Sequence, residues 1–223
     1  MGSAESKQAD ARLQQASLSD VTFPTRFNLY YQGKARVRLI LGEDKTDAAY
    51  VISLPGGWYG NLVLYNGPTS EAAPLAVIRS GRKMGFHDVV DLAAPQPGQR
   101  PIREELRTHG NKWSMAYAFV IATRGPDALP EKFEWRGSRG DEVKSLGEYF
   151  YGWKLLRLGR DEEVVAVGAE AKLSRSFSKA GAFQFLGSGA TGELGAAWSV
   201  LAVASFVRIV QKQMQAAISA SSA

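Results

Sequence analysis

The sequence predicts a mainly β protein that ends in one long apolar helix. Between Phe23 and about Phe185 the apolar residues fall in short segments, several with a period of two, separated by turn residues. From Leu194 to Ile218 the pattern changes to a helical period with no proline. A series of short strands at this spacing is typical of a β-sandwich or a β-barrel.

The clearest strand is the segment from Trp113 to Ile121. Its large side chains, at Trp113, Met115, Tyr117, Phe119 and Ile121, alternate with smaller ones. Because successive side chains of a strand point to opposite faces, this alternation predicts a row that faces a core.

Weaker versions of the same pattern predict the remaining strands. We expect them at 36–41, 49–54, 62–65, 75–78, 133–136, 153–158, 163–167 and 172–185. The Gly- and Asp-containing turn over 159–162 predicts a hairpin between two of these segments. Residues 93–112 contain three prolines and are expected to form one long irregular connection at the surface.

The C-terminal helix is unusual because its first half is apolar on every side. Leu194 to Val207 is interrupted only by small residues such as Ser199 and Ser205, and a polar stripe begins at Arg208. A helix of this kind must be buried in protein or in lipid. The apolar stretch has about 14 residues, whereas a membrane span needs about 20. The length therefore favours a core helix over a membrane tail anchor.

The composition excludes several kinds of chemistry. The chain has 223 residues, a formal net charge of +5 and no cysteine. Thiol catalysis, cysteine-ligated zinc and disulfides are thereby excluded, and a reducing compartment is favoured. Neither a nucleophile elbow nor a zinc-protease motif occurs. We expect a protein without catalytic residues, metal or cofactor, located in the cytoplasm, with a membrane surface or the nucleus as alternatives.

The two ends of the chain are expected to be disordered. Residues 1–22 are rich in Ala, Ser and Gln without the apolar core of a signal peptide, and residues 219–223 form a short tail. The first six residues fit the pattern for N-myristoylation at Gly2. The alternative is an ordinary start with small residues.

Two local motifs have both a functional and a structural interpretation. Gly187 to Gly192 matches the G-x-G-x-x-G pattern of dinucleotide binding, but no second parallel strand follows it. We therefore favour a flexible turn that leads into the C-terminal helix, with Thr191 as a candidate N-cap. His87, Asp88 and Asp91 contain metal-ligand types, but a single histidine with two carboxylates is nonspecific.

Basic residues gather in several short segments. The candidates for an anion-binding surface are Arg36, Arg38, Arg79, Arg82 and Lys83. Two further clusters lie at 136–144 and 154–160. On a strand, alternate basic residues project to the solvent face. They indicate either an ordinary solvated outer face or a surface that binds anions.

Four segments together resemble the tubby C-terminal-like superfamily, which includes the LURP-one-related proteins and the phospholipid scramblases, and most closely its fungal members. The segments are residues 133–136 (FEWR), 141–146 (DEVKSL), 152–158 (GWKLLRL) and 192–195 (GELG), the last followed by Trp198. The resemblance implies a closed antiparallel barrel of about twelve strands, formed by one domain over 23–218 and threaded by the helix 194–218.

The resemblance also implies a function. Tubby domains bind phosphoinositide head groups through basic residues, and scramblases associate with membranes. A barrel filled by a helix has no interior pocket, so function is expected on its outer surface or rim. We expect a non-enzymatic binding or adaptor protein that docks on anionic phospholipid, with nucleic-acid association or protein scaffolding as alternatives. Nucleic acid is disfavoured because Trp113, Trp135 and Trp153 occupy strand positions that predict burial.

Overall fold

The computed structural model confirms the predicted fold class. It describes residues 4–32, 37–81, 87–111, 114–123, 128–147, 149–159, 161–171 and 178–221. In chain order the elements are α1 (Ala4–Leu13), β1 (Arg26–Gln32), β2 (Arg38–Gly42), β3 (Tyr50–Ser53), β4 (Leu62–Tyr65), β5 (Pro74–Ser80), β6 (His87–Leu92), β7 (Ile102–Asn111), β8 (Ser114–Ile121), β9 (Glu131–Ser138), α2 (Asp141–Lys144), β10 (Gly152–Arg157), β11 (Glu163–Glu170), β12 (Lys179–Phe185), α3 (Gly187–Ala190) and α4 (Gly195–Ser221). Each strand pairs antiparallel with the next in sequence, and β12 pairs with β1 to close a barrel of twelve strands.

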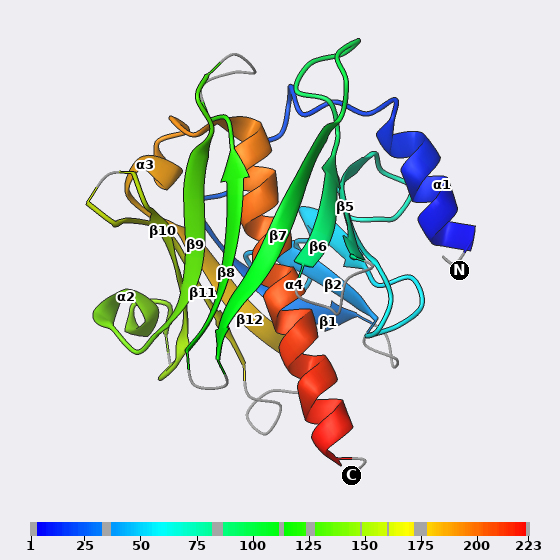
Figure 1. Ribbon diagram of the computed structural model, residues 1–223. Coiled ribbons are helices and arrows are strands. Elements are labelled where there is room, and N and C mark those ends of the chain that lie inside the picture. The colour runs from blue at the N-terminus through cyan, green and yellow to red at the C-terminus, as the bar shows by residue number, and fades with distance from the viewer. Residues whose placement is uncertain are drawn as a thin grey trace.

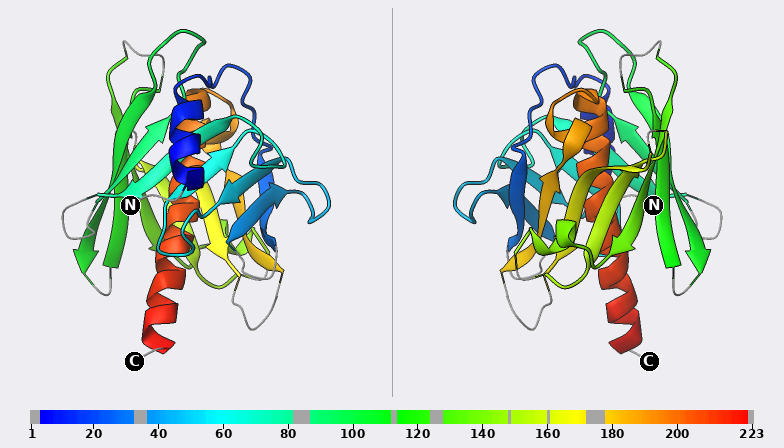
Figure 2. Two further views of the ribbon diagram at one scale, coloured as in Figure 1. Left: turned by 90° about the vertical axis from the view of Figure 1, so that its right-hand side faces the viewer. Right: turned by 90° about the vertical axis from the view of Figure 1, so that its left-hand side faces the viewer.

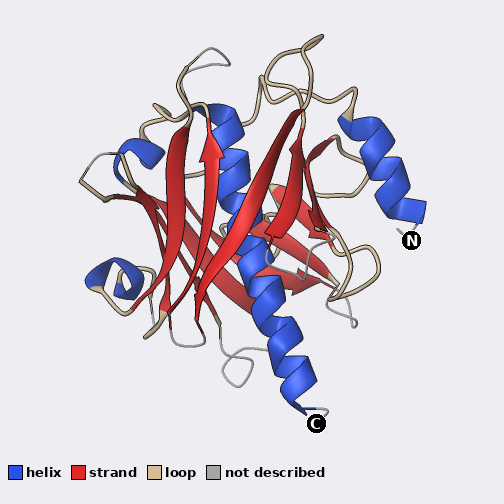
Figure 3. Cartoon of the chain, viewed as in Figure 1, coloured by secondary structure: helices blue, strands red, loops and turns tan. Residues whose placement is uncertain are grey.

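Helix α4 runs through the interior of this barrel (Figures 1 and 3). All of its residues from Val200 to Gln211 are buried, which accounts for the lack of a polar face in the sequence. The interpretation as a core helix is therefore confirmed. Among the described residues, no helix combines the length and the apolar character that a membrane span requires.

The wall of the barrel is shaped to admit the helix. A Cβ atom at Gly168 of β11 would lie 2.4 Å from the ring of Phe206, so only glycine leaves room for that ring. Phe206 packs between the rings of Trp135 and Phe183 at centroid distances of 5.7 and 5.6 Å. The Nε1 of Trp135 donates a hydrogen bond of 2.9 Å to Ser205, which satisfies a polar group of the apolar half of the helix.

A buried ion pair fixes the position of α4 along the barrel. Arg208 is 1% exposed and donates to the Asp88 carboxylate of β6 at 2.7 Å. Lys212, one turn further along α4, lies 2.9 Å from the other oxygen of Asp88. Arg208 also bonds Gln211 and Ser80, so its guanidinium is extensively paired. Sliding the helix would separate these charges inside the protein, which is strongly unfavourable.

Short helices cover two parts of the outer wall (Figures 2 and 3). Helix α1 lies on β5. Helix α2 packs Val143 and Leu146 against Val167, Ala169 and Ala182 on the outer side of β11 and β12. The apolar outward residues of these strands are therefore buried as well.

Three expectations from the sequence are wrong. Residues 1–22 are not a disordered segment throughout, because 4–13 form α1 and both Leu13 and Leu18 are 1% exposed. Residues 93–112 are not one irregular connection, because 102–111 form β7. The sequence of β7 does not alternate between apolar and polar residues, because Glu104 and Thr108 share the inward face of the strand with Leu106. At the C-terminus the helix continues to Ser221, so residues 219–221 are not a disordered tail.

The buried pair generates a stability prediction. Asp88→Ala leaves Arg208 buried without a carboxylate, and we expect it to lower the free energy of unfolding by about 3–5 kcal/mol. The double variant Asp88→Ala/Arg208→Met removes the buried charge as well and is expected to lose less than Asp88→Ala alone. Urea unfolding measures both, with the exposed Glu43→Ala as a control. An Asp88→Ala protein as stable as the control would contradict the assignment.

Candidate docking surface

The barrel has two ends with different chemistry. Because neighbouring strands are antiparallel, the connections β1–β2, β3–β4, β5–β6, β7–β8, β9–β10 and β11–β12 all lie at one end. Helix α4 starts after β12 at the opposite end, so its C-terminus emerges among these connections (Figures 1 and 2). We call six exposed, described residues at this end the exit rim: Arg38, Tyr59, Met115, Arg139, Phe150 and Tyr151. The exposed Asp141 and Lys144 of the β9–β10 connection lie at the same end and pair with each other.

Large apolar side chains are exposed mainly at the exit rim. Six are exposed among the described residues, and four of them belong to the rim: Tyr59 (63%), Met115 (44%), Phe150 (72%) and Tyr151 (43%). Tyr59 hydrogen-bonds Ser219 of the emerging helix at 3.0 Å. Exposed apolar side chains gathered in one region indicate a surface that contacts another molecule.

Two arginines of the exit rim are available for an anion. Arg38 begins β2 and Arg139 follows β9, and both are exposed. Within the part of the chain that the structure describes, neither forms an ion pair. Burial raises the pKa of Tyr151, and the positive charge of Arg139 offsets part of this rise. A cation and an aromatic ring of the rim therefore lie close together.

The opposite end of the barrel is acidic. The described residues of its connections include the acidic Glu43, Asp44, Asp47, Glu71, Asp161, Glu162 and Glu193, against the basic Lys45 and Arg100. The described connections of the exit end carry two basic residues, Arg139 and Lys144, against two acidic ones, Asp141 and Glu142, so their charge is balanced. An anionic surface would therefore repel the opposite end more strongly than the exit rim.

Of the predicted anion-binding residues, the structure describes Arg38 and Arg79. Arg38 is part of the exit rim. Arg36, Arg82 and Lys83 lie outside the described residues, as does Gly2.

Arg79 is already occupied. It lies on the outer face of β5 and binds the carboxylates of Asp10 in α1 and Asp91 in β6. Arg103 binds the same Asp91 at 2.6 Å. Burial alone would raise the pKa of Asp91, but the hydrogen bonds from Arg103 and Arg79 outweigh it and lower that pKa. The predicted role of Arg79 in binding an external anion therefore requires that Asp10 leaves.

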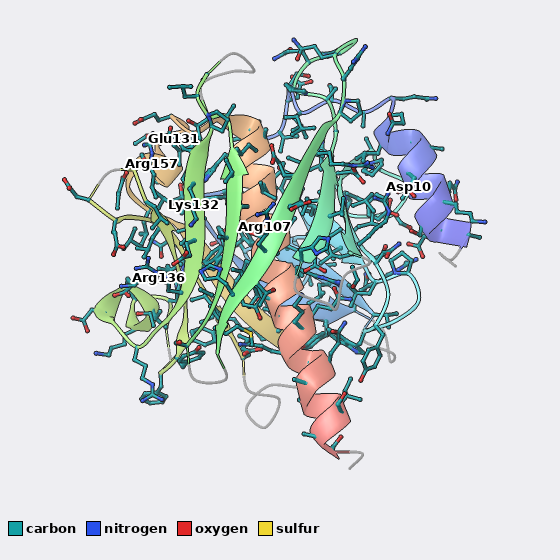
Figure 4. All side chains as sticks on the ribbon, in the orientation of Figure 1. Asp10, Arg107, Glu131, Lys132, Arg136 and Arg157 are labelled. Carbon is teal, nitrogen blue, oxygen red and sulfur yellow. The ribbon has the colours of Figure 1, made fainter. Side chains whose placement is uncertain are left out.

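The outer wall of β7–β9 also carries basic residues, but most are neutralised locally (Figure 4). Arg107 pairs with Glu105 at 2.9 Å, and Arg136 pairs with Glu134 and Glu162. This wall corresponds to the solvated outer face considered for the basic clusters.

One residue of those clusters, Arg157, does not reach solvent. Its side chain is 0% exposed and faces the barrel interior, where it binds Glu131 at 2.6 Å and Glu193 at 3.3 Å (Figure 4). The expectation of a solvated Arg157 is wrong because the alternation of a strand does not reveal which face is inside. We interpret this network as structural, since it joins β9, β10 and the segment before α4.

The glycine motif also serves the fold. The backbone N–H and the hydroxyl of Ser188 both donate to the carboxylate of Glu163, at 2.7 and 2.9 Å. A group of this protein thus occupies the donors that a phosphate would need. The segment leads into the helix as expected, but it is not a simple turn, because residues 187–190 form the short helix α3. Thr191 is the C-cap of α3 and not the N-cap of α4, which begins four residues later.

The candidate metal ligands do not converge. Asp88 faces inward to Arg208, whereas Asp91 faces outward to Arg79, because the two residues are three positions apart on β6. Across the residues that the structure describes, no group of three potential ligands could hold a metal ion.

Sequence reasoning missed a partly buried acid near the exit rim. Glu170 ends β11 and faces α4, where the side-chain amide of Gln213 lies against its carboxylate. When the amide O and N are assigned from their hydrogen-bonding partners, the nitrogen donates to Oε2 at 2.7 Å. The oxygen of the same amide accepts from Trp153 Nε1 at 3.2 Å. Burial raises the pKa of Glu170 to about 7, and no cation among the described residues offsets this rise. The C-terminal part of α4 is therefore in contact with a group that titrates near neutral pH.

Comparison with protein-family models, with curated proteins and with solved structures finds no match to this chain.

Glu170 generates a pH prediction. Its pKa is higher in the folded protein than its ordinary value of 4.5, so its contribution to stability is full below pH 4.5 and is lost as the pH rises through about 7. The loss at pH 8 is expected to reach up to about 3 kcal/mol. Glu170→Gln should therefore be more stable than the wild type at pH 8 and similar to it at pH 4.5, as measured by urea unfolding.

The matched control is Glu142→Gln. A hydrogen bond from Ser138 lowers the pKa of Glu142, so this variant should gain no stability at pH 8. An equal effect of Glu170→Gln at both pH values would contradict the assignment.

Proposed function

We propose that this protein is a binding protein that docks on anionic phospholipid surfaces through its exit rim. The observation that carries the proposal is that the rim combines four exposed apolar side chains with the unpaired Arg38 and Arg139. On this proposal the protein acts in the cytoplasm as a peripheral membrane protein, since the cytoplasmic leaflet is the anionic one.

The two kinds of side chain have complementary roles. A basic residue near an anionic membrane contributes about 1 kcal/mol, which is too little to hold a protein alone. Aromatic side chains favour the region of the lipid head groups, where their rings are partly buried. Each signal is weak by itself, and stable attachment generally needs two of them. The exit rim supplies both around one opening.

The emerging end of α4 is compatible with such contact. From Gln213 to Ser221 it carries no charged residue, and Tyr59 connects it to the rim. A charged helix end would have to keep its hydration, whereas this one can approach head groups at little electrostatic cost. The acidic end of the barrel faces away in this orientation, which limits repulsion.

Membership of the tubby C-terminal-like superfamily and a preference for phosphoinositides are part of this proposal. A role as an adaptor without catalysis and without a cofactor is also part of it. The support comes from the filled barrel and from the position of the rim. The predicted contributions of Arg36, Arg82 and Lys83, and of an acyl chain on Gly2, stay predictions.

One observation favours a second candidate, single-stranded nucleic acid. The charge of Arg139 acts on the exposed Tyr151, so the two side chains are near each other. In such a pair the aromatic ring can stack on a base while the arginine binds a phosphate. The large tryptophans do not contribute, because Trp135 and Trp153 are 0% and 3% exposed as expected, and Trp113 lies outside the described residues. We favour the membrane because four apolar side chains exceed what phosphate binding needs.

Charge reversal at the rim tests the proposal. We test this by co-sedimentation with vesicles that contain phosphatidylserine or a phosphoinositide. The affinity of Arg38→Glu/Arg139→Glu for these vesicles is expected to be at least roughly tenfold lower than that of the wild type. The matched control Lys45→Glu/Arg100→Glu makes the same change in net charge at the acidic end and is expected to retain binding. Equal losses in both variants would show that only net charge matters and would contradict a specific rim.

Removal of the apolar contacts gives an independent test. Phe150→Ser/Tyr151→Ser leaves the charges in place and is expected to weaken binding severalfold, because it removes apolar area that lipid would cover. The expected binding is salt-sensitive and absent for neutral phosphatidylcholine vesicles. Tight binding of single-stranded RNA together with no vesicle binding would favour the second candidate instead.

A further inference from the structure

Helix α1 covers an apolar part of the outer wall. Val77 and Leu75 share a face of β5 with Arg79, because alternate residues of a strand point the same way. Arg79 meets α1 on the outside, so this is the outward face. Both apolar side chains are nevertheless 0% exposed. A face of this kind is buried only while something lies on it.

The contacts that hold α1 in place are mostly polar. Only Ser6, Ala9 and Leu13 of the helix are buried. Arg12 donates to backbone carbonyls in the connection between β4 and β5. Asn61 donates to Ser6 at 2.6 Å. When hydrogen bonds of this partly exposed type break, water replaces the lost partners, so the free energy of the protein changes little. An isolated helix of ten residues is also unstable, so α1 depends on docking for its structure.

The ionic network permits α1 to leave. Arg79 binds Asp10 of α1 and Asp91 of β6 at the same time. When Asp10 leaves, Arg79 keeps Asp91, so no buried charge loses its last partner. Part of the guanidinium then becomes available to another acceptor, beside the 72% exposed Arg103. Asp10 thus occupies a position in which an external anionic group would fit.

We propose that α1 is an autoinhibitory strap, whose release exposes Arg79 and the apolar outer face of β5 to an anionic phospholipid surface. The inference rests on the proposed function and adds its regulation. The same connection, between β3 and β4, carries Asn61 beneath α1 and Tyr59 of the exit rim, so the uncovered face adjoins the rim. A lipid surface can satisfy both parts of this face, since it covers apolar side chains and presents phosphates to Arg79.

A reversible disulfide can test the strap in the full-length protein. The native chain has no cysteine, and the side chains of Ser6 and Asn61 are in contact, so Ser6→Cys/Asn61→Cys introduces the only pair. Oxidation should hold α1 in place, and mass spectrometry verifies the bond. We expect the oxidised form to bind phosphatidylserine vesicles about tenfold more weakly than the same protein after reduction, a typical coupling for a two-state switch.

A charge reversal gives a second test that needs no disulfide. Asp10→Arg places two arginines against each other and should release α1, raising vesicle affinity about tenfold. The matched control Asp20→Arg makes the same change in net charge on the same segment without touching Arg79, and it should give a smaller gain. Oxidation of Asp10→Arg in the cysteine background should cancel the gain.

The outcomes separate the strap from the docking surface. Equal binding of the oxidised and reduced forms, or equal gains in Asp10→Arg and Asp20→Arg, would overturn the strap while Arg38→Glu/Arg139→Glu still tests the rim. Failure of every form to bind vesicles would overturn the proposed function and the strap together.

Discussion

The fold depends on one constraint, which is that the interior of a twelve-stranded barrel must be filled. Eight strands enclose a space that wall side chains can fill, but a larger barrel leaves a void unless another element enters it. Helix α4 is that element, and its apolar circumference is the consequence. The Arg208–Asp88 pair then fixes its depth, while Gly168 gives room to Phe206. The barrel and the helix are therefore one cooperative unit rather than a shell and an insert.

A filled barrel leaves its outer surface and its rims for function. The direction of α4 makes the rims unequal, because the helix enters at the acidic end, close to Arg157 and Glu193, and leaves at the other. Several described polar groups of the entry end bind one another, as the contacts of Ser188 with Glu163 illustrate. The exposed aromatic residues Tyr59, Phe150 and Tyr151 lie at the exit end, together with Arg38 and Arg139. The candidate site therefore lies at the end of the barrel where α4 emerges, and the topology decides which end this is.

Sequence periodicity predicted the elements whose two faces differ strongly. The strand that contains Tyr117 and Phe119 and the apolar helix were evident for this reason, whereas β7 was not, because Glu104 faces inward. The closure into a barrel came from a resemblance and not from periodicity, since pairing between distant strands leaves no local pattern. Arg38 was a candidate from the start, but the rim aromatics were not. Aromatic residues in turn segments, such as Tyr59 and Phe150, are the signal that could have indicated them.

Buried charges in this protein fall into two groups. Arg157 and Arg208 have several partners that belong to the barrel and its central helix, so they have one stable arrangement. Arg79 has one partner on the barrel and one on α1, and the acid Glu170 has an amide rather than a cation beside it. Release of α1, as proposed, would leave Arg79 paired with Asp91, and protonation would neutralise Glu170, so neither change would leave an unpaired buried charge. Both α1 and Glu170 lie near the exit rim, where a bound ligand would stabilise one of the two states over the other. The pairs of Arg157 and Arg208 keep the barrel itself unchanged between these states.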